Sequence, residues 1–485
     1  MQPRSRFLPF LPLLLLAGAC TGAAAVLLIA GWFLIANRPV GPADPGLASE
    51  IVVEPAATRL SDDGAPTPIP TSATLEVDPA TQSGPPVISA DILDQMTSIE
   101  RQVVEIRGLL PGGVFTRSLM SPDQLRERVT ADFFADYTTE EAAEDALVLA
   151  AFGLLDPQTD LLGLYTLLFS EQVAGFYDNE TKEMVVVQEA KFGGIQQLTY
   201  AHEYTHALQD QTYAMRDGLG YTDELCELDT ERCAGIQALI EGDSTLVEVI
   251  WLFDYSSPLD QQEIFQAFEE LDTSILDSAP AYLQKDFLFP YDQGFKFVQS
   301  LYDQGGFAAV DGAYRDLPVS TEQIIHPDRY PHDRPVLVEL PDLIDLLGSG
   351  WSLLDANVLG EWYTYLVLAF GENPNARLLE NEAGQAAEGW GGDRYAVYYN
   401  AESGQTAMVM ATIWDTPPDA AEFAQAFSEH AGARYGASSA DPSGALLWES
   451  ASGVTAFYRF GDETYWVLAP DRATVMEILS SVKIP

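Results

Sequence analysis

The sequence is poor in basic residues and in histidine. Lysine and arginine together number 24 against 73 aspartates and glutamates, which gives a formal net charge of −49 over 485 residues. A surface of this charge repels nucleic acids and anionic lipid headgroups, so nucleic acid is excluded as a partner. Histidine occurs only five times. A local grouping of histidines is therefore unlikely to arise by chance.

Charged residues are also missing from one long stretch near the N-terminus. Two arginines precede an uncharged, largely apolar run over residues 7–36, which is long enough to span a bilayer. We expect residues 1–36 to be an uncleaved signal anchor, with the rest of the chain outside the cytoplasm. The alternatives are a cleaved signal peptide and lipoprotein cleavage at Cys20, where Ala17 replaces the usual large aliphatic residue. All three interpretations place most of the chain outside the cytoplasm.

Cysteine occurs three times. Besides Cys20, the chain has Cys226 and Cys233, and outside the cytoplasm we expect these two to form a disulfide. Zinc ligation by the pair is disfavoured because no second cysteine or histidine pair lies nearby in the sequence. Two reduced, buried cysteines are the remaining alternative.

The composition changes along the chain and predicts an α+β protein. Residues 37–90 are rich in Pro, Ala, Gly, Ser and Thr without apolar periodicity, which is typical of an extended linker. Residues 91–350 show mostly helical periodicity around a small sheet. Residues 351–485 contain several short segments, among them "TAMVMATIW", that look like antiparallel strands, which predicts a smaller α+β domain.

The stretch "YAHEYTHALQDQ", residues 200–211, contains the pattern H-E-x-x-H. On a helix His202 and His206 lie one turn apart on the same face, where both imidazoles can bind one zinc ion. Glu203 then lies beside the metal and can take a proton from a zinc-bound water. The alternative is an amphipathic helix with two exposed histidines.

A third ligand is expected from the next helical pattern, which begins at Asp229 or Thr230. Glu241 lies there among apolar residues, where a carboxylate is costly to bury unless it is paired or bound to metal. The adjacent Gly242 is unfavourable in a helix and indicates close approach by another element. Glu248 is the alternative ligand, and a glutamate facing solvent is the alternative to a metal role.

Strand patterns at 173–177 and 183–188 predict a hairpin directly before the H-E-x-x-H helix. The edge of the second strand could pair with an extended peptide. An ordinary hairpin that packs under the helix fits the pattern equally well.

A downstream segment, "STEQIIHPDRYPHDRP", offers donors for the oxyanion that amide hydrolysis creates. We expect His326 and Tyr330 to be catalytic, and Arg329 and His332 are alternative candidates. His430 is expected to be a solvated helix residue without a role.

H-E-x-x-H followed by a helix glutamate resembles the gluzincin group of zinc metallopeptidases. From about residue 95 to the end, motifs such as "GFYDNETKEM", "ALIEGDSTL", "STEQIIHPDRY" and "LGEW" resemble a family of bacterial membrane-anchored predicted metallopeptidases. The resemblance implies a zincin-like fold, zinc bound by His202, His206 and Glu241, and Glu203 as catalytic base. Thr245 stands where gluzincins usually have an aspartate, so we expect Asp243 to orient a ligand histidine instead.

Three functions are compatible with these patterns. The first is a membrane-tethered, extracytoplasmic zinc peptidase that acts on peptides or proteins. The second is a cell-envelope binding or scaffold protein that keeps the peptidase fold, although zinc retention alone does not require Glu203. The third is a zinc hydrolase that acts on another amide, because zinc–water chemistry is common to amides.

Overall fold

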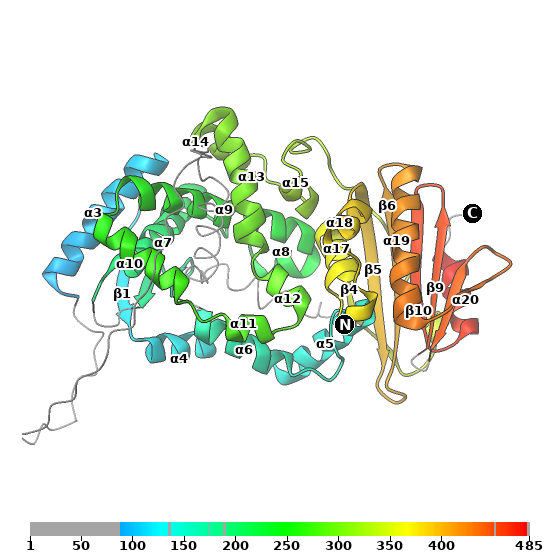
Figure 1. Cartoon of the computed structure of the whole chain (residues 1–485). Coiled ribbons are helices and arrows are strands. Elements are labelled where there is room, and N and C mark those ends of the chain that lie inside the picture. The colour runs from blue at the N-terminus through cyan, green and yellow to red at the C-terminus, as the bar shows by residue number, and fades with distance from the viewer. Residues whose placement is uncertain (1–87, 134–136, 173, 188–190, 451–452, 483–485) are drawn as a thin grey trace, which may run out of the picture.

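The structure is a computed structural model that describes residues 88–133, 137–172, 174–187, 191–450 and 453–482. The predicted anchor and nearly all of the predicted linker lie outside the described residues. Within these described ranges, no helix combines the length and apolar character needed to cross a bilayer. The described chain is α+β, as the sequence predicts, with most helices in the first part and a large antiparallel sheet in the second (Figure 1).

The helices before the large sheet are α3 (Ala90–Arg107), α4 (Pro122–Phe133), α5 (Thr139–Phe152), α6 (Leu161–Gln172), α7 (Gly194–Tyr213), α8 (Asp223–Leu228), α9 (Thr230–Asp254), α10 (Pro258–Glu269), α11 (Ser274–Ser278), α12 (Ala281–Asp286), α13 (Phe289–Gly305), α14 (Phe307–Ala313), α15 (Thr321–Ile325) and α16 (Ile344–Leu347). Those that follow are α17 (Gly360–Phe370), α18 (Glu380–Ala387), α19 (Pro417–Tyr435) and α20 (Arg472–Val482), with a 3-10 turn η2 (Pro374–Ala376).

A small sheet lies directly before α7. Its strands β1 (Thr116–Met120), β3 (Glu183–Val187) and β2 (Gly175–Asp178) are ordered β1-β3-β2, with β1 parallel and β2 antiparallel to β3. The hairpin prediction is therefore correct. The expectation of a free edge on its second strand is wrong, because β3 is paired on both sides. A peptide added to this sheet would have to pair with β1 or β2.

Three helices, α7, α9 and α13, form the centre of the first part (Figure 1). The crossing of α9 and α13 is close because a glycine on each helix faces the other backbone. A Cβ at Gly242 would lie 2.1 Å from Gly294 O, and a Cβ at Gly294 would lie 2.2 Å from Ala238 O. The predicted close approach at Gly242 is confirmed, and it fixes the register of α13 beside Glu241.

The second sheet has the order β4-β5-β6-β10-β9-β8-β7 and is antiparallel throughout. Its strands are β4 (Trp351–Asn357), β5 (Trp390–Asn400), β6 (Gln405–Trp414), β7 (Ser439–Ala440), β8 (Leu446–Ser450), β9 (Gly453–Phe460) and β10 (Glu463–Ala469). Both faces are covered, because α19 packs on one face and α20 on the other. Alternate residues of β6 follow this division: Met408 and Met410 face α19, whereas Ala407 and Val409 belong to the core under α20.

The two parts of the chain share one hydrophobic core. The largest buried cluster extends from Leu125 in α4 to Trp466 in β10. Phe152 of α5, for example, packs edge-on against Trp466 with ring centroids 5.7 Å apart. The C-terminal sheet therefore packs directly against the helices that precede it.

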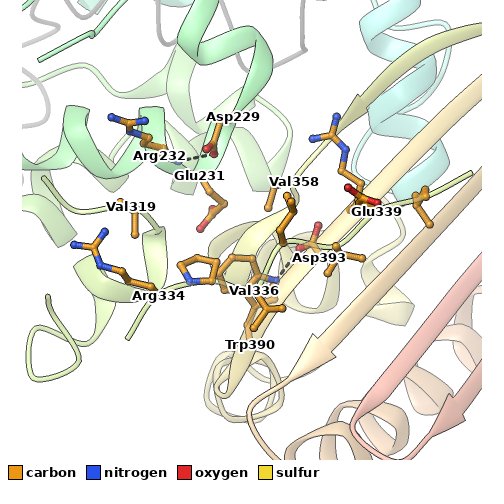
Figure 2. A pocket seen from close by; sticks show the side chains of 16 residues that line it. Asp229, Glu231, Arg232, Val319, Arg334, Val336, Glu339, Val358, Trp390 and Asp393 are labelled. Carbon is orange, nitrogen blue, oxygen red and sulfur yellow. Dashed lines mark hydrogen bonds between the residues drawn. The ribbon is translucent and has the colours of Figure 1, made fainter. Parts of the chain in front are cut away.

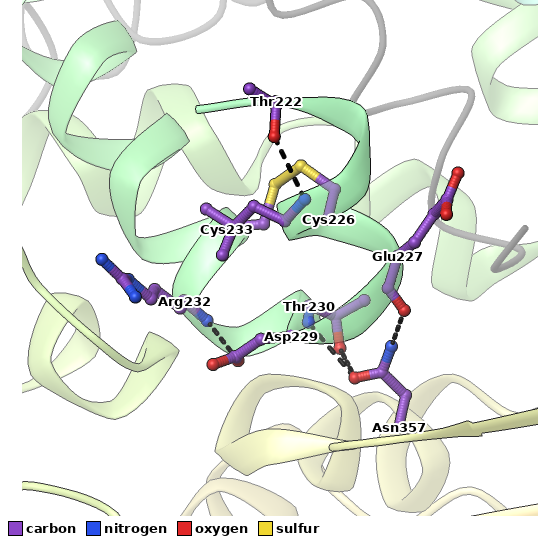
Figure 3. Close-up of a disulfide and its surroundings, with 9 residues drawn as sticks. Thr222, Cys226, Glu227, Asp229, Thr230, Arg232, Cys233 and Asn357 are labelled. Atoms are coloured by element: carbon purple, nitrogen blue, oxygen red, sulfur yellow. Dashed lines mark hydrogen bonds between the residues drawn. A yellow bond between two sulfur atoms is a disulfide. The ribbon is translucent and has the colours of Figure 1, made fainter. Parts of the chain in front are cut away.

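A disulfide joins Cys226 of α8 to Cys233 of α9 (Figure 3). It closes the corner at which α9 begins, and Asp229 caps α9 by accepting a hydrogen bond from the Arg232 N–H at 3.0 Å. The same corner contacts the C-terminal sheet, because Asn357 at the end of β4 donates to Glu227 O at 2.8 Å (Figure 3). The bond thus fixes the beginning of the helix that carries Glu241.

Replacing both cysteines, Cys226→Ala with Cys233→Ala, is expected to lower the free energy of unfolding by about 2–3 kcal/mol. The reason is that the bond restricts a short loop in the unfolded chain. Denaturant unfolding of the wild type and the double variant measures the difference. Equal stability of the two proteins would contradict a stabilising role for the disulfide.

Candidate metal centre

Helix α7 is buried on all sides between Leu198 and Asp210, although many of its residues are polar. His202 is 1% exposed, Glu203 0% and His206 3%. Polar and charged side chains in such a position require partners, because their desolvation is costly. The alternative of an amphipathic helix with two exposed histidines is therefore wrong.

The two histidines of α7 and Glu241 of α9 bring three donor atoms together. His202 Nε2 lies 3.2 Å from His206 Nε2, and each of these nitrogens lies 3.4 Å from Glu241 Oε2. Glu241 is 1% exposed, which rules out the alternative of a glutamate facing solvent. We call these three residues the ligand triangle, and their donor atoms form a group that could hold a metal ion.

The dimensions of the ligand triangle fit zinc. Zinc binds nitrogen and carboxylate oxygen at about 2.0–2.2 Å in a tetrahedral arrangement, which places neighbouring ligand atoms about 3.3–3.5 Å apart. The observed separations of 3.2 and 3.4 Å match one face of such a tetrahedron. Two histidines and one glutamate are also a donor set typical of a catalytic zinc site, in which the fourth position is open.

Electrostatics favours a positive charge within this group. Burial by itself lowers the pKa of His202, but hydrogen bonds to Glu241 and Glu248 outweigh this effect and raise the pKa to about 10. Burial by itself raises the pKa of Glu241, but its interactions with His206 and His202 lower the pKa to about 2. The carboxylates thus stabilise positive charge between them, whether a proton or a metal ion supplies it.

The outer nitrogen of each histidine has its own supporting residue. Glu248 Oε2 lies 2.9 Å from His202 Nδ1, and Gln209 Oε1 lies 2.8 Å from His206 Nδ1. Glu248 is therefore placed behind a ligand and not in the ligand triangle. It performs the orienting role that Thr245, three residues earlier, cannot perform for lack of a carboxylate.

Asp243 lies one step further from the metal position than the sequence predicts. Its carboxylate accepts hydrogen bonds from Arg107 Nε at 2.8 and 3.0 Å, from Gln209 Nε2 at 3.0 Å and from the Tyr314 hydroxyl at 3.0 Å. Gln209 in turn contacts His206. The expectation that Asp243 itself orients a ligand histidine is corrected, because Gln209 stands between the two.

Helix α13 forms a further wall of the ligand triangle. The ring of Tyr291 lies beside that of His202, with centroids 6.4 Å apart and an angle of 39° between the rings. Tyr291 is buried and lies one helical turn before Gly294, the glycine that contacts α9. The close crossing of α9 and α13 therefore also positions Tyr291.

His326 lies among residues that contact the beginning of α9, away from the ligand triangle. Its Nε2 lies 2.9 Å from Glu361 Oε1, and the preceding Gly360 packs directly against the Glu231 carboxylate. Glu231 and Glu241 are ten residues apart on α9, which corresponds to about 15 Å along the helix. The catalytic role expected for His326 therefore has no support from its position.

Tyr330 and Arg329 also have partners of their own. The Tyr330 hydroxyl donates to Asp316 O at 2.5 Å, and its ring packs edge-on against Phe297. Arg329 contacts several carboxylates: Glu322, Asp415 and Glu388. Glu322, Asp333 and Asp415 form a second group spaced closely enough for a metal ion. The guanidinium of Arg329 already supplies positive charge there.

The other two histidines, His332 and His430, differ in their exposure. His332 is exposed. His430 is buried in α19, with Nδ1 2.9 Å from Ala376 O, and burial lowers its pKa to about 4. The expectation of a solvated His430 is wrong, and its position indicates a packing role.

A pocket of about 740 Å³ lies between the beginning of α9, the segment 334–340 and the beginning of β5 (Figure 2). Two acidic residues in its wall, Glu231 and Asp393, are buried and accept hydrogen bonds from other residues of the protein. Glu231 accepts hydrogen bonds from the backbone N–H and hydroxyl of Thr321. Asp393 accepts from two backbone N–H groups at the beginning of α17. The Glu231 bonds join α9 to α15, and the Asp393 bonds join β5 to the beginning of α17. Glu231 lies ten residues along α9 from Glu241 of the ligand triangle.

Four residues of the candidate metal centre were not found from sequence: Gln209, Glu248 in its supporting role, Tyr291 and Arg107. Gln209 lies three residues after His206, and this spacing on a helix gives a usable signal. Glu248 was considered only as a ligand. Arg107 is separated from Asp243 by 136 positions, and no local pattern connects them.

Comparison with known families gives one match. A family described as a domain of unknown function (DUF8575) matches residues 352–479, which extend from β4 to α20. No curated protein and no solved structure matches the chain. The matched residues include the sheet side of the pocket, and the ligand triangle lies outside the match.

Proposed function

We propose that the protein is an extracytoplasmic zinc peptidase with a zincin-like first part. The observation that carries this proposal is the ligand triangle, whose three buried donor atoms are spaced 3.2–3.4 Å apart within an H-E-x-x-H helix. Glu203 is a fourth functional group of the proposed centre, since it directly follows His202 in the same helix. Its charge contributes to the raised pKa of His202.

The roles of the protein groups follow from their positions. His202, His206 and Glu241 would hold the ion, which would act as a Lewis acid toward the scissile carbonyl and water. Glu203 accepts the proton from the attacking water and returns it to the leaving amine. Glu248 and Gln209 keep the two imidazoles oriented. The candidate donor to the oxyanion is Tyr291 and not His326 or Tyr330, since the ring of Tyr291 lies beside His202.

One observation favours a second candidate, a scaffold that binds metal without catalysis. The side chains of the ligand triangle and of Glu203 are at most 3% exposed, so a peptide bond can reach them only if neighbouring groups move. A structural metal site needs no such access. The peptidase proposal therefore requires the surrounding structure to open during turnover.

The proposal also includes a membrane anchor at the N-terminus. The basic residues before the apolar run at 7–36 favour an anchor that leaves residues 91–485 outside the cytoplasm. Membrane fractionation with protease protection on intact and permeabilised cells tests this arrangement. Residues 91–485 should be digested when protease is added to cells whose outer barrier has been opened but whose cell membrane is intact.

Metal analysis of the purified full chain, combined with cleavage of a diverse peptide library, tests the function. One zinc ion per chain together with peptide cleavage would support the peptidase. Bound zinc with cleavage only of acyl or cell-wall amides would indicate another amide hydrolase. Bound zinc without any hydrolysis would favour the scaffold, and absence of zinc binding would reject the metal centre.

A further inference from the structure

We propose that a buried relay, Arg107–Asp243–Gln209, sets the tautomer of His206 so that its Nε2 lone pair points at the metal position. This inference deepens the proposed function and rests on it. Gln209 is thus a positioning residue for the metal ligand. Arg107, at the end of α3, acts on the ligand through two intervening side chains.

The first step of the relay is the pairing of Arg107 with Asp243. Both side chains are fully buried, and Arg107 Nε lies 2.8 Å from Asp243 Oδ1. Arginine carries donors only, so the facing carboxylate oxygens must accept. Arg107 Nη1 also donates to Asp311 Oδ1 at 2.7 Å, which holds the guanidinium from a second side.

The second step is the orientation of the Gln209 amide. Its Nε2 lies 3.0 Å from Asp243 Oδ2 and 3.0 Å from Ile240 O. Both of these atoms only accept hydrogen bonds, so the two hydrogens of the amide nitrogen are used on this side. A flipped amide would place its oxygen against two other oxygens. Gln209 Oε1 must therefore face the opposite way, toward His206.

The third step fixes the proton on His206. Gln209 Oε1 lies 2.8 Å from His206 Nδ1 and can only accept, so Nδ1 carries the hydrogen in the neutral ring. Ser244 is consistent with this, because its hydroxyl donates to Gln209 Oε1 at 3.4 Å and its oxygen lies 3.1 Å from His206 Nδ1. Nε2 then carries the lone pair and faces the ligand triangle, as a metal ligand requires.

The test is the zinc affinity of Gln209→Leu, measured on the full chain by competition with a chelator. We expect a loss of about 10- to 100-fold, because residues that hold a ligand histidine contribute this much. Gln323→Leu is the matched control. Gln323 is also fully buried, accepts from Val319 N at 2.8 Å and donates to Asp333 O, but it lies in α15. It should lower stability without changing zinc affinity.

Cobalt(II) provides a readout that a structural role would not change. In the cobalt-loaded wild type, the Nδ1 protons of both ligand histidines should give paramagnetically shifted NMR signals that exchange slowly. Gln209→Leu should lose one of the two signals, because the proton of His206 no longer has its acceptor. The signal of His202, which Glu248 holds, should remain.

A double-mutant cycle tests the connection to Arg107. Arg107→Gln should weaken zinc binding by itself and should add little in the Gln209→Leu background, since both act through the same contact. If Gln209→Leu kept the wild-type zinc affinity, or lost no more zinc affinity than Gln323→Leu, the relay would be overturned. The metal centre would remain intact. A wild type that binds no zinc would overturn the metal centre and the relay together.

Discussion

Glu203→Gln is expected to give a folded, zinc-loaded protein with about a hundred- to ten-thousand-fold lower rate of peptide hydrolysis. Glutamine has nearly the same shape as glutamate but cannot accept a proton from water, and general acid–base catalysis contributes a factor of this size. Glu203 is not part of the ligand triangle, so its replacement should leave the metal in place. Hydrolysis rates, zinc content and melting temperature of the variant and the wild type give the answer.

Glu231→Gln is the matched control for this variant. Glu231 is likewise buried, and burial raises its pKa, but it lies at the beginning of α9 and contacts Thr321. Its replacement should leave the hydrolysis rate of the folded protein unchanged. A Glu203→Gln protein that hydrolyses the same substrates at the wild-type rate would exclude Glu203 as the base.

His206→Ala and Glu241→Ala are each expected to lower zinc affinity by more than about a hundredfold. Each variant removes a metal ligand, and loss of a ligand weakens binding more than the 10- to 100-fold loss caused by a missing supporting residue. Chelator competition measures the affinity, and elemental analysis of the purified variants measures the zinc that remains bound.

Glu248→Ala provides the comparison on the same helix. Glu248 lies behind His202, at 2.9 Å from Nδ1, and its loss should weaken zinc binding by only about 10- to 100-fold. The ligand assignment would be contradicted if Glu248→Ala lost more affinity than Glu241→Ala. Full zinc occupancy in His206→Ala would contradict the metal centre as a whole.

Much of the local structure could be predicted because it depends on neighbours in sequence. The helical periodicity of residues 91–350 and the H-E-x-x-H spacing predicted α7, the strand-like segment "TAMVMATIW" predicted β6, and Gly242 predicted a close helix crossing. Whether the second strand of the hairpin has a free edge could not be predicted from neighbouring residues. The strand β1 that pairs with β3 comes from more than sixty residues earlier, and pairing across such a distance leaves no local pattern.

The sequence by itself determined the chemistry of the candidate centre: His202 and His206 share a helix face because they are four residues apart, and Glu203 must lie beside them. Only the tertiary structure decided which carboxylate completes the ligand triangle and which supports it. Glu241 and Glu248 are both buried glutamates on α9, seven residues and about two turns apart, so periodicity places them on nearly the same face. The crossing of α7 and α9 brings Glu241 to the Nε2 atoms and Glu248 to Nδ1 of His202. Packing of helices that are distant in sequence sets that crossing, and for this reason Arg107 lies at the centre while His326 and Tyr330 do not.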